Sequence, residues 1–330
     1  MIEAAAPAFR QAARAMRAAA MNVLAPAVAR RAMPWLGQAG LALDDGHLCF
    51  ASITRPAGGR PRLVRCESRP LPRLQDAGVT LRQLFADPRL QQLPCNFVLG
   101  TDDYRWLLVE TPELSPAELH AAVRWRIQEL IDFPVAEAVL DVFDMPHLNG
   151  DGQAGQRSRG VVVSRAATLA QHTAAMTRGG VPLAAIDVPE FALRNLAALL
   201  PPSEHAVALL HVREEQSLLQ ITRGNTIHLS RRVPVGYAGA DAPLRLAFEA
   251  VRSIEYYEGR FAEPVGAFCL APCVQALPGV VEEIAQAVDV PVRQLALDEL
   301  LECPAGGNPA TQARCLHAIG AALRREGGAR

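Results

Sequence analysis

The sequence predicts a two-lobed α/β fold, and three observations support that prediction. The chain has 330 residues, half of them apolar, which is enough for two or three packed subdomains. A strand–turn–strand pattern opens near residue 40 and begins again at residue 206. Each copy continues into mixed helices and strands. An internal duplication of this kind favours two lobes with a cleft between them.

The first half begins with "GLALDDGHLCFASI", followed after the turn "PAGGRP" by "RLVRCESRPL". Apolar runs bounded by Gly and Pro predict strands here. A helix is expected near residues 81–85, and "CNFVLG" predicts the next buried strand. Later in this half we expect a helix ending at residues 179–180, the strand "PLAAIDV" and a helix near 191–200.

A smaller strand–helix–strand segment is expected between these elements. "YRWLLVE" predicts its first strand, and Ser115-Pro116-x-Glu118 is a capping box that starts a helix. The helix is expected to end near residue 130. "VLDVFDM" and "VVVSR" predict further strands, separated by a Gly-rich loop at 149–160. The helix is expected to bury an apolar stripe formed by Leu119, Val123, Ile127 and Leu130.

The second half repeats the opening pattern. "AVALLHVREEQSLLQITRG" predicts two strands joined by a turn, and "TIHLSRRVPVG" predicts a third strand. A helix over about 241–261, the strand "GAFCLA", a helix at 279–288 and the strand "PVRQLAL" are expected to follow. The last predicted element is the helix "TQARCLHAIGAALRR".

Charge and residue usage exclude several classes of function. The formal net charge is −1, so we expect no nucleic-acid partner. All 33 basic residues are Arg, as codon bias in a GC-rich genome would produce, and the lack of Lys excludes a P-loop or Schiff-base lysine. The seven Cys show no repeated spacing, so no zinc site is predicted and free thiols indicate a reducing compartment. No stretch approaches the roughly 20 apolar residues of a membrane-spanning helix.

Residues 1–35 differ from the rest of the chain, because they are rich in Ala and carry five Arg against one Glu. Three apolar residues recur at seven-residue spacing, with three Arg on a neighbouring face, which is the pattern of a basic amphipathic helix. These residues are Phe9, Met16 and Val23, and Arg10, Arg14 and Arg17. Two interpretations are open: contact with an anionic membrane surface or acidic partner, or a solvated extension.

The remaining candidate sites give no catalytic prediction. Asp102 and Asp103 follow a strand, but no further carboxylate is predicted within reach, so a turn is favoured over a Mg²⁺ site. Nothing near Ser164, His172 and Asp187 indicates a strained nucleophile turn, and the His residues form no paired motif. We therefore predict no catalytic residue and no metal site.

A Trp between two Arg lies within the helix predicted after Ser115. Trp125 lies off the apolar stripe, so it is either packed beneath this segment or exposed as an anchor for a partner. Trp and Arg are over-represented among residues that dominate binding energy at interfaces. We predict Trp125, Arg124 and Phe133 as partner-binding residues.

The stretch "DDYRWLLVETPELSPAELHAAVRWRIQELIDFPVAEAVLDVFDMP" at 102–146 resembles the MshI family of MSHA-type pilus biogenesis proteins. More broadly it is similar to PilM, the cytoplasmic actin-like component of type IV pilus machines. "RSIEYYEGRF" and "CLHAIGAALR" are also similar to PilM segments, so the resemblance covers about residues 38–325. It implies an actin-like (ASKHA) fold with two lobes and a small strand–helix–strand insert.

The resemblance also implies a division of the chain. An N-terminal arm would occupy residues 1–36, and lobe I would comprise 37–200 plus 305–330. The insert would lie within lobe I at about 101–163, and lobe II would occupy 201–304.

Actin-like proteins hold ATP between two Gly-bearing hairpins and an adenosine loop, because phosphates must approach backbone N–H groups closely. In this sequence other residues stand at the Asp and Gly positions of that pattern. They are Ala42 and Asp44 in the first hairpin, His211 and Arg213 in the second, and Ala271 and Pro272 in the adenosine loop. We therefore expect a pseudo-ATPase without a cofactor, with ATP binding by a remodelled pocket as the alternative.

The function implied by the resemblance is a non-catalytic scaffold on the cytoplasmic face of the inner membrane. Its expected partners are PilN-like and PilO-like inner-membrane pilus proteins, with the cytoplasmic tail of the PilN-like protein bound directly. Two alternatives are open: an ATP-binding ATPase of the same machinery, and a GspL-like cytoplasmic component of type II secretion.

Overall fold

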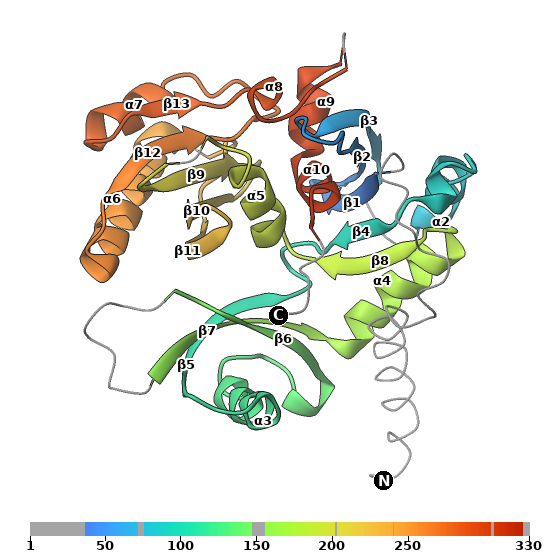
Figure 1. The fold of residues 1–330 in the computed structure, drawn as a ribbon, viewed down its shortest axis with the longest axis horizontal. Helices are drawn as coiled ribbons and strands as arrows, with labels where there is room; N and C mark the ends of the chain where they lie inside the picture. The colour runs from blue at the N-terminus through green and yellow to red at the C-terminus, as the bar shows by residue number, and fades with distance from the viewer. Residues whose placement is uncertain are drawn as a thin grey trace.

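The computed structural model describes residues 37–71, 76–146, 156–201, 203–239, 241–304 and 307–325. These residues form two five-stranded sheets and one three-stranded sheet. Figure 1 shows the two larger sheets side by side with helices between them, and the small sheet below. The predicted two-lobed α/β fold with a strand–helix–strand insert is confirmed.

Lobe I is built on the sheet with strand order β3-β2-β1-β4-β8. Its first three strands form an antiparallel meander, and β4 and β8 continue the sheet in parallel with β1. Buried side chains of α2 and α4 complete the core on one face of this sheet. The elements are β1 (Gln38–Asp44), β2 (His47–Thr54), β3 (Arg62–Pro70), α2 (Ala77–Leu84), β4 (Cys95–Val98), α4 (Ala166–Arg178) and β8 (Leu183–Asp187).

Lobe II repeats this topology in the order β11-β10-β9-β12-β13. Again three antiparallel strands are followed by two parallel ones, so the duplication predicted from the sequence pattern is present in the fold. Helices α6 and α7 pack on this sheet through its apolar core. The elements are β9 (Ala206–Val212), β10 (Ser217–Arg223), β11 (Thr226–Val233), α6 (Ala242–Phe261), β12 (Val265–Leu270), α7 (Val280–Ala287) and β13 (Val292–Gln294).

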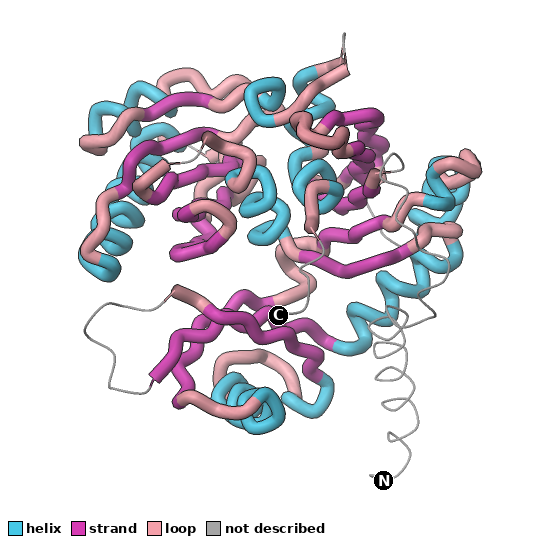
Figure 2. Tube along the Cα trace, viewed as in Figure 1, coloured by secondary structure: helices cyan, strands magenta, loops and turns pink. Residues whose placement is uncertain are grey.

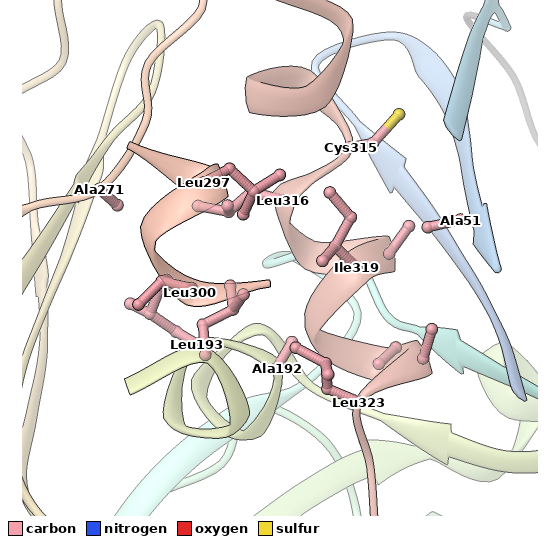
Figure 3. Packing of buried hydrophobic residues seen from close by; sticks show 14 of the residues in the cluster. Ala51, Ala192, Leu193, Ala271, Leu297, Leu300, Cys315, Leu316, Ile319 and Leu323 are labelled. Carbon is pink, nitrogen blue, oxygen red and sulfur yellow. The ribbon is translucent and has the colours of Figure 1, made fainter. Parts of the chain in front are cut away.

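A third apolar core joins the lobes, as Figure 3 shows around Ile319 and Leu193. It combines residues of α5 (Pro189–Ala197), α8 (Leu297–Leu300) and α10 (Leu316–Ala322) with side chains from strands of both sheets. The short helix α9 (Pro309–Arg314) precedes α10. Two glycines allow α10 its close packing. A Cβ on Gly40 of β1 would lie 2.0 Å from the carbonyl oxygen of Ala318, and one on Gly320 would lie 2.2 Å from that of Ala192. These contacts fix α10 against β1 and α5.

The insert is the three-stranded sheet β5-β7-β6 with α3 packed on one face (Figure 2). Its other face contacts the body of the protein, where Trp106 and Phe143 lie 5.5 and 5.0 Å from the ring of Phe191 in α5. The elements are β5 (Arg105–Pro112), α3 (Pro116–Ile127), β6 (Ala138–Asp144) and β7 (Gln156–Arg165). Short 3-10 turns occur at Leu90–Gln92 and Val135–Glu137.

Two details of the insert differ from the prediction. The capping box is confirmed, with Ser115 N donating to Glu118 Oε2 at 3.1 Å, but α3 ends at Ile127. Leu130, predicted to be buried, therefore lies in the following turn and is 52% exposed. Residues 156–160, predicted as loop, belong to β7 because all of them pair with β5, and Arg159 and Gly160 also pair with β6.

The predicted amphipathic arm at 1–35 lies outside the described residues. Among the residues that are described, no helix has the length and apolar character needed to cross a membrane.

Candidate functional site

Two hairpin turns face each other between the lobes. The β1–β2 turn consists of Asp45 and Gly46, whose φ angles of 44° and 71° fit the two-residue turn that Asp-Gly favours. The β9–β10 turn spans residues 213–216, with Arg213 N donating to Gln216 O at 3.2 Å. These are the two hairpins at which the resemblance implies that actin-like proteins hold phosphate, and at which we predicted that this chain does not.

The Arg213 side chain crosses the space between these turns. Its guanidinium forms ion pairs with Asp44 and with Asp45, the latter at 2.7 Å between Nη2 and Oδ1. Only 13% of the Arg213 side chain is exposed. Burial lowers the pKa of Arg213, but the two carboxylates outweigh burial and raise it above its ordinary value. A charge pair therefore joins the lobes at a position where the family pattern has Gly.

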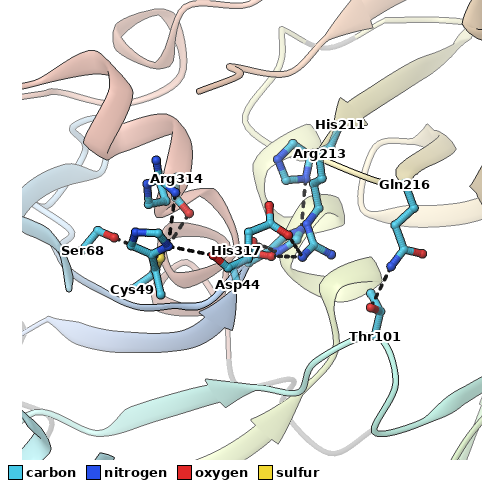
Figure 4. A network of polar contacts seen from close by, with 11 residues as sticks. Asp44, Cys49, Ser68, Thr101, His211, Arg213, Gln216, Arg314 and His317 are labelled. Atoms are coloured by element: carbon cyan, nitrogen blue, oxygen red, sulfur yellow. Dashed lines mark hydrogen bonds and ion pairs between the residues drawn. The ribbon is translucent and has the colours of Figure 1, made fainter. Parts of the chain in front are cut away.

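Two buried histidines extend this cluster, as Figure 4 shows. Nδ1 of His317, on α10, lies 2.8 Å from Oδ2 of Asp44, and its Nε2 lies 3.1 Å from Nδ1 of His211. When both imidazoles are neutral, His211 donates to His317, which donates to Asp44. The cluster is thus a continuous chain of polar contacts from lobe II to lobe I.

The charges of the cluster shift two pKa values. Burial by itself raises the pKa of Asp44, but His317 and Arg213 outweigh it and lower the value to about 2. Burial lowers the pKa of His211 well below its ordinary value, and the neighbouring His317 lowers it further. At neutral pH the cluster therefore holds an ionised Asp44 and an uncharged His211.

A second polar group lies beside the first. Arg232 Nη1 donates to the carbonyl oxygen of Thr101 at 2.7 Å, and Gln216 Nε2 donates to the Thr101 hydroxyl at 3.0 Å. The Tyr104 hydroxyl donates to the buried Glu190, whose Oε1 lies 3.6 Å from Arg232 Nε. Burial raises the pKa of Glu190, against the opposing effect of Arg232. These contacts tie β11 and the β9–β10 turn to lobe I.

Together these side chains fill the space between the hairpins. A cavity in this space, lined by Arg213, Arg232 and His317 among others, has a volume of about 10 Å³. That is roughly room for one water molecule, whereas small-molecule sites typically measure about 300–1,000 Å³. In this arrangement side chains occupy most of the space between the hairpins.

Three of the six predicted pocket positions lie in this cluster: Asp44, His211 and Arg213. The others do not. Ala42 and Ala271 are buried in the core between the lobes, where Figure 3 shows Ala271 near α8. Pro272 follows Ala271 and is half-buried.

The sequence prediction missed His317, Asp45, Glu190 and Arg232. The reason is spatial, because each meets its partner only through contacts between distant parts of the chain. His317 reaches Asp44 because Gly40 lets α10 pack on β1. The return of the last helix to lobe I, which the resemblance implied, was the one available signal for this contact.

The acidic pair before the insert lies in the predicted turn. Asp103 N donates to Gly100 O at 3.0 Å, which closes the predicted turn, and Asp103 Oδ2 lies 2.8 Å from His172 Nε2. Asp102 is exposed. Within the described residues, no group of three or more His, Cys, Asp or Glu side chains is arranged to hold a metal ion.

The predicted partner-binding residues of the insert differ in their surroundings. Trp125 is 67% exposed on α3. Arg124 instead donates to the carbonyl oxygens of Val135 and Ala138 at 2.9 and 3.1 Å, and so holds the turn before β6. Phe133 is half-buried in the insert core, with the Arg165 guanidinium 4.4 Å above its ring. Of the three, Trp125 alone presents most of its side chain to solvent.

The duplicated sheets, the helices between them and the facing hairpins define an actin-like fold. Solved structures agree with this class. The chain is similar to the PilM–PilN type IV pilus biogenesis complex, with a TM-score of 0.67 and 17% identity over 88% of this chain and 97% of that chain. It is also similar to the cytoplasmic domain of EpsL, an inner membrane component of the type II secretion system of Vibrio cholerae, with a TM-score of 0.51 and 10% identity.

The EpsL similarity covers 87% of this chain and 95% of that domain. No family model matches the sequence, and no curated protein matches it. At these identities the similarities establish the actin-like fold that the resemblance implied. The narrower resemblance to MshI stays a prediction.

Proposed function

We propose that this chain is a non-catalytic actin-like scaffold of an inner-membrane assembly machine of the type IV pilus kind. The observation that carries the proposal is the pairing of Arg213 with Asp44 and Asp45 across the two hairpin turns. A scaffold has to keep its lobes in a fixed relation. A buried charge pair whose members are further bonded to neighbours favours one arrangement over others.

The same cluster disfavours ATP. A triphosphate placed between the hairpins would displace Arg213 and face the carboxylates of Asp44 and Asp45. Breaking a buried charge pair costs about 3–5 kcal/mol, which nucleotide binding would first have to offset. The proposal therefore treats the chain as a pseudo-ATPase that needs no cofactor.

The similarity to the PilM–PilN complex supports a partner of the PilN kind, because nearly the whole of that chain is covered. We propose that the cytoplasmic segment of a PilN-like membrane protein binds this chain directly, with a PilO-like protein in the same assembly. The chain would then act on the cytoplasmic face of the inner membrane without spanning it. The similarity to EpsL favours a second candidate, a GspL-like component of type II secretion.

We propose that the partner binds at the surface around Trp125. A Trp that is 67% exposed leaves a large apolar area in water, and such side chains mark interaction sites. The helix that carries it is held at its start by the Ser115–Glu118 capping box and near its end by the Arg124 hydrogen bonds. Trp125 is therefore presented on a fixed backbone, which lowers the entropy cost of binding.

Binding measurements with Trp125→Ala test this placement. The probe is the cytoplasmic segment of a PilN-like protein, made as a synthetic peptide. Truncating an interface anchor costs at least about 2 kcal/mol, or roughly thirtyfold in Kd. We expect that loss in calorimetry, with a melting temperature close to wild type because the side chain is exposed.

Val79→Ala is the matched control, because Val79 is also an exposed apolar residue on a helix. It should leave affinity unchanged. If Trp125→Ala binds the segment as tightly as Val79→Ala does, the partner does not use Trp125. If the segment of a GspL-associated protein binds and the PilN-like segment does not, the second candidate replaces the first.

A further inference from the structure

The insert is joined to lobe I at two places that lie side by side. The chain enters the insert through residues 99–104, the entry segment, and leaves it where β7 runs directly into α4. Asp103 connects the two places. Its carbonyl oxygen accepts a hydrogen bond from the Ser164 hydroxyl at 2.6 Å, and its Oδ2 lies 2.8 Å from Nε2 of His172 in α4. Entry and exit therefore form one junction, which sets the orientation of the insert.

Lobe II holds the entry segment through Arg232 of β11, a strand on the side of lobe II that faces the insert in Figure 1. The Arg232 guanidinium lies 4.5 Å from the centre of the Tyr104 ring, and its Nη1 donates to the carbonyl oxygen of Thr101 at 2.7 Å. Its Nε lies 3.6 Å from Oε1 of Glu190 in α5, which accepts a hydrogen bond from the Tyr104 hydroxyl. One side chain of lobe II thus contacts two residues of the entry segment.

The same sheet of lobe II carries the side chains that close the space between the lobes. Gln216, whose Nε2 donates to the Thr101 hydroxyl at 3.0 Å (Figure 4), lies in the β9–β10 turn that Arg213 begins. Strand β10 continues from this turn and pairs with β11, with Leu218 opposite Arg232. Because the hydrogen bonds of the sheet fix the spacing of its strands, Arg213, Gln216 and Arg232 move together.

Another contact between lobe II and the insert is weaker. Oε1 of Glu110 in β5 lies 4.0 Å from Nη2 of Arg260 in α6, and the Glu110 side chain is 54% exposed. Exposed ion pairs of this kind contribute little to stability. The Arg232 side chain is more enclosed, and its partner Glu190 is buried. Arg232 is therefore the stronger of these two links between lobe II and the insert.

We propose that Arg232 couples the orientation of the insert to the closure of the two lobes. With the lobes closed, as in this structure, Arg213 pairs with Asp44 and Asp45 while Arg232 holds the entry segment. Separation of two lobes about a hinge is a common domain motion. It would carry the sheet with Arg213 and Arg232 away from lobe I, so that the entry segment is released and the insert reorients.

This coupling has a consequence for a partner of the insert. A partner that binds the insert only in its held orientation favours closed lobes, and closed lobes favour the partner by the same factor. That consequence rests on the proposed function, in which the partner binds around Trp125. The coupling itself needs no partner, so a failure of the Trp125 binding test would leave it standing.

Hydrogen exchange of the full chain, followed by mass spectrometry at neutral pH, tests the coupling without a partner. Arg232→Gln removes the charge and the ring contact. Amides of residues 101–112 should then exchange roughly tenfold faster, as expected for the loss of a hydrogen bond to a charged group. Arg213→Gln breaks the ion pairs with Asp44 and Asp45 and should accelerate exchange of the same residues.

The double variant separates coupling from a merely structural role of Arg232. If Arg232 transmits closure, the entry segment is already released in either single variant. Arg213→Gln combined with Arg232→Gln should then exchange residues 101–112 no faster than the single variants do. If the two residues act independently, their effects on exchange should multiply.

Arg260→Gln is the matched control, because it removes another Arg of lobe II that lies near the insert and leaves the entry segment untouched. It should not change exchange at residues 101–112. Strand β12, in the core of lobe II, should exchange alike in all variants, which shows that the fold is intact. If a Gln variant does not fold, Arg232→Lys or Asp45→Asn takes its place, since each keeps the side chain polar and weakens the same contacts.

Three results would overturn the proposal. The first is unchanged exchange at residues 101–112 in a folded Arg232 variant. The second is an effect of Arg213→Gln that stays within the two hairpin turns. The third is a double variant in which the two effects multiply.

Discussion

At the scale of single residues, Asp44 has a structural role that its sequence position did not indicate. The family pattern has Gly there, and the sequence suggested a loss of phosphate binding. In the structure the carboxylate pairs with Arg213 and accepts a hydrogen bond from His317. The carboxylate of Asp44 therefore forms a link between the lobes. The sequence alone indicated that Asp44 and Arg213 stand at Gly positions of the family pattern. Only the fold shows that the two side chains contact each other.

Asp44→Asn tests the energetic weight of this link. The variant removes one of the two negative charges that pair with Arg213. Breaking a buried ion pair costs about 3–5 kcal/mol of stability. We expect the lower end of this range, because Asp45 still pairs with Arg213 at 2.7 Å. In thermal unfolding at neutral pH this corresponds to a decrease of roughly 6–12 °C. Asp102→Asn alters an exposed Asp and should change the melting temperature little.

The same variant predicts a pH dependence. The folded pKa of Asp44 is about 2, below its ordinary value of 3.8, so its stabilising effect is present above pH 3.8. It is lost as pH falls through the interval down to about 2. Urea unfolding of wild type and Asp44→Asn should give a constant difference at higher pH that shrinks across this interval. A difference that stays constant to pH 2 would show that ionised Asp44 contributes nothing.

His211 gives a second pH effect at milder acidity. Burial holds its pKa well below 6.5, so the unfolded chain takes up a proton first as pH decreases. Wild-type stability should therefore fall as pH drops below about 6.5, and His211→Gln should show a smaller slope in urea unfolding between pH 6.5 and 5. His228, whose pKa is also lowered by burial, contributes equally to both proteins. Equal slopes would contradict this role for His211.

At the scale of secondary-structure elements, the local sequence predicted where α3 begins better than where it ends. The capping box placed the start of α3 at Pro116, and the strand–turn–strand pattern predicted the β1–β2 hairpin. The end of α3 was predicted three residues too late, because the apolar spacing continued to Leu130 after the backbone had left the helix. The exposure of Trp125 was one of two open interpretations, since helical spacing alone does not show what covers a face.

The position of α10 depends on glycine, which gives a prediction for this element. Gly320→Ala would place a Cβ 2.2 Å from the backbone oxygen of Ala192, so α10 and α5 must separate. We expect a loss of about 1–3 kcal/mol from overpacking. Gly259→Ala is the control, because nothing lies within 4 Å of its added Cβ on α6. Ala is favoured over Gly within a helix, so that variant should gain about 0.5–1 kcal/mol.

These two variants are compared by urea unfolding. A Gly320→Ala protein as stable as Gly259→Ala would show that close packing of α10 does not limit stability. If Gly320→Ala lowers stability and Gly259→Ala does not, the contact of His317 with Asp44 should also weaken. The reason is that α10 carries both Gly320 and His317.

At the scale of the whole molecule, the repeated strand–turn–strand pattern predicted the architecture because both lobes use the same strand order. The filling of the space between the lobes by side chains was not predictable. It depends on Arg213, Arg232 and His317 arriving from three different elements. The exposure of Leu244 and Phe248 on α6 was equally hidden, because these residues have the spacing of core residues and only the fold shows them uncovered.

The central claim is that the interlobe space holds side chains in place of a nucleotide, and a thermal-shift titration with ATP·Mg²⁺ tests it most directly. A ligand at 100 times its Kd adds about 2.7 kcal/mol, or roughly 5–10 °C for a chain of this size. We expect the melting temperature to stay unchanged at millimolar ATP·Mg²⁺, a concentration at or above the KM range of about 1 μM–1 mM that is typical of enzymes. A saturable rise of several degrees would contradict the account, and its loss on Arg213→Ala would place the nucleotide between the hairpins.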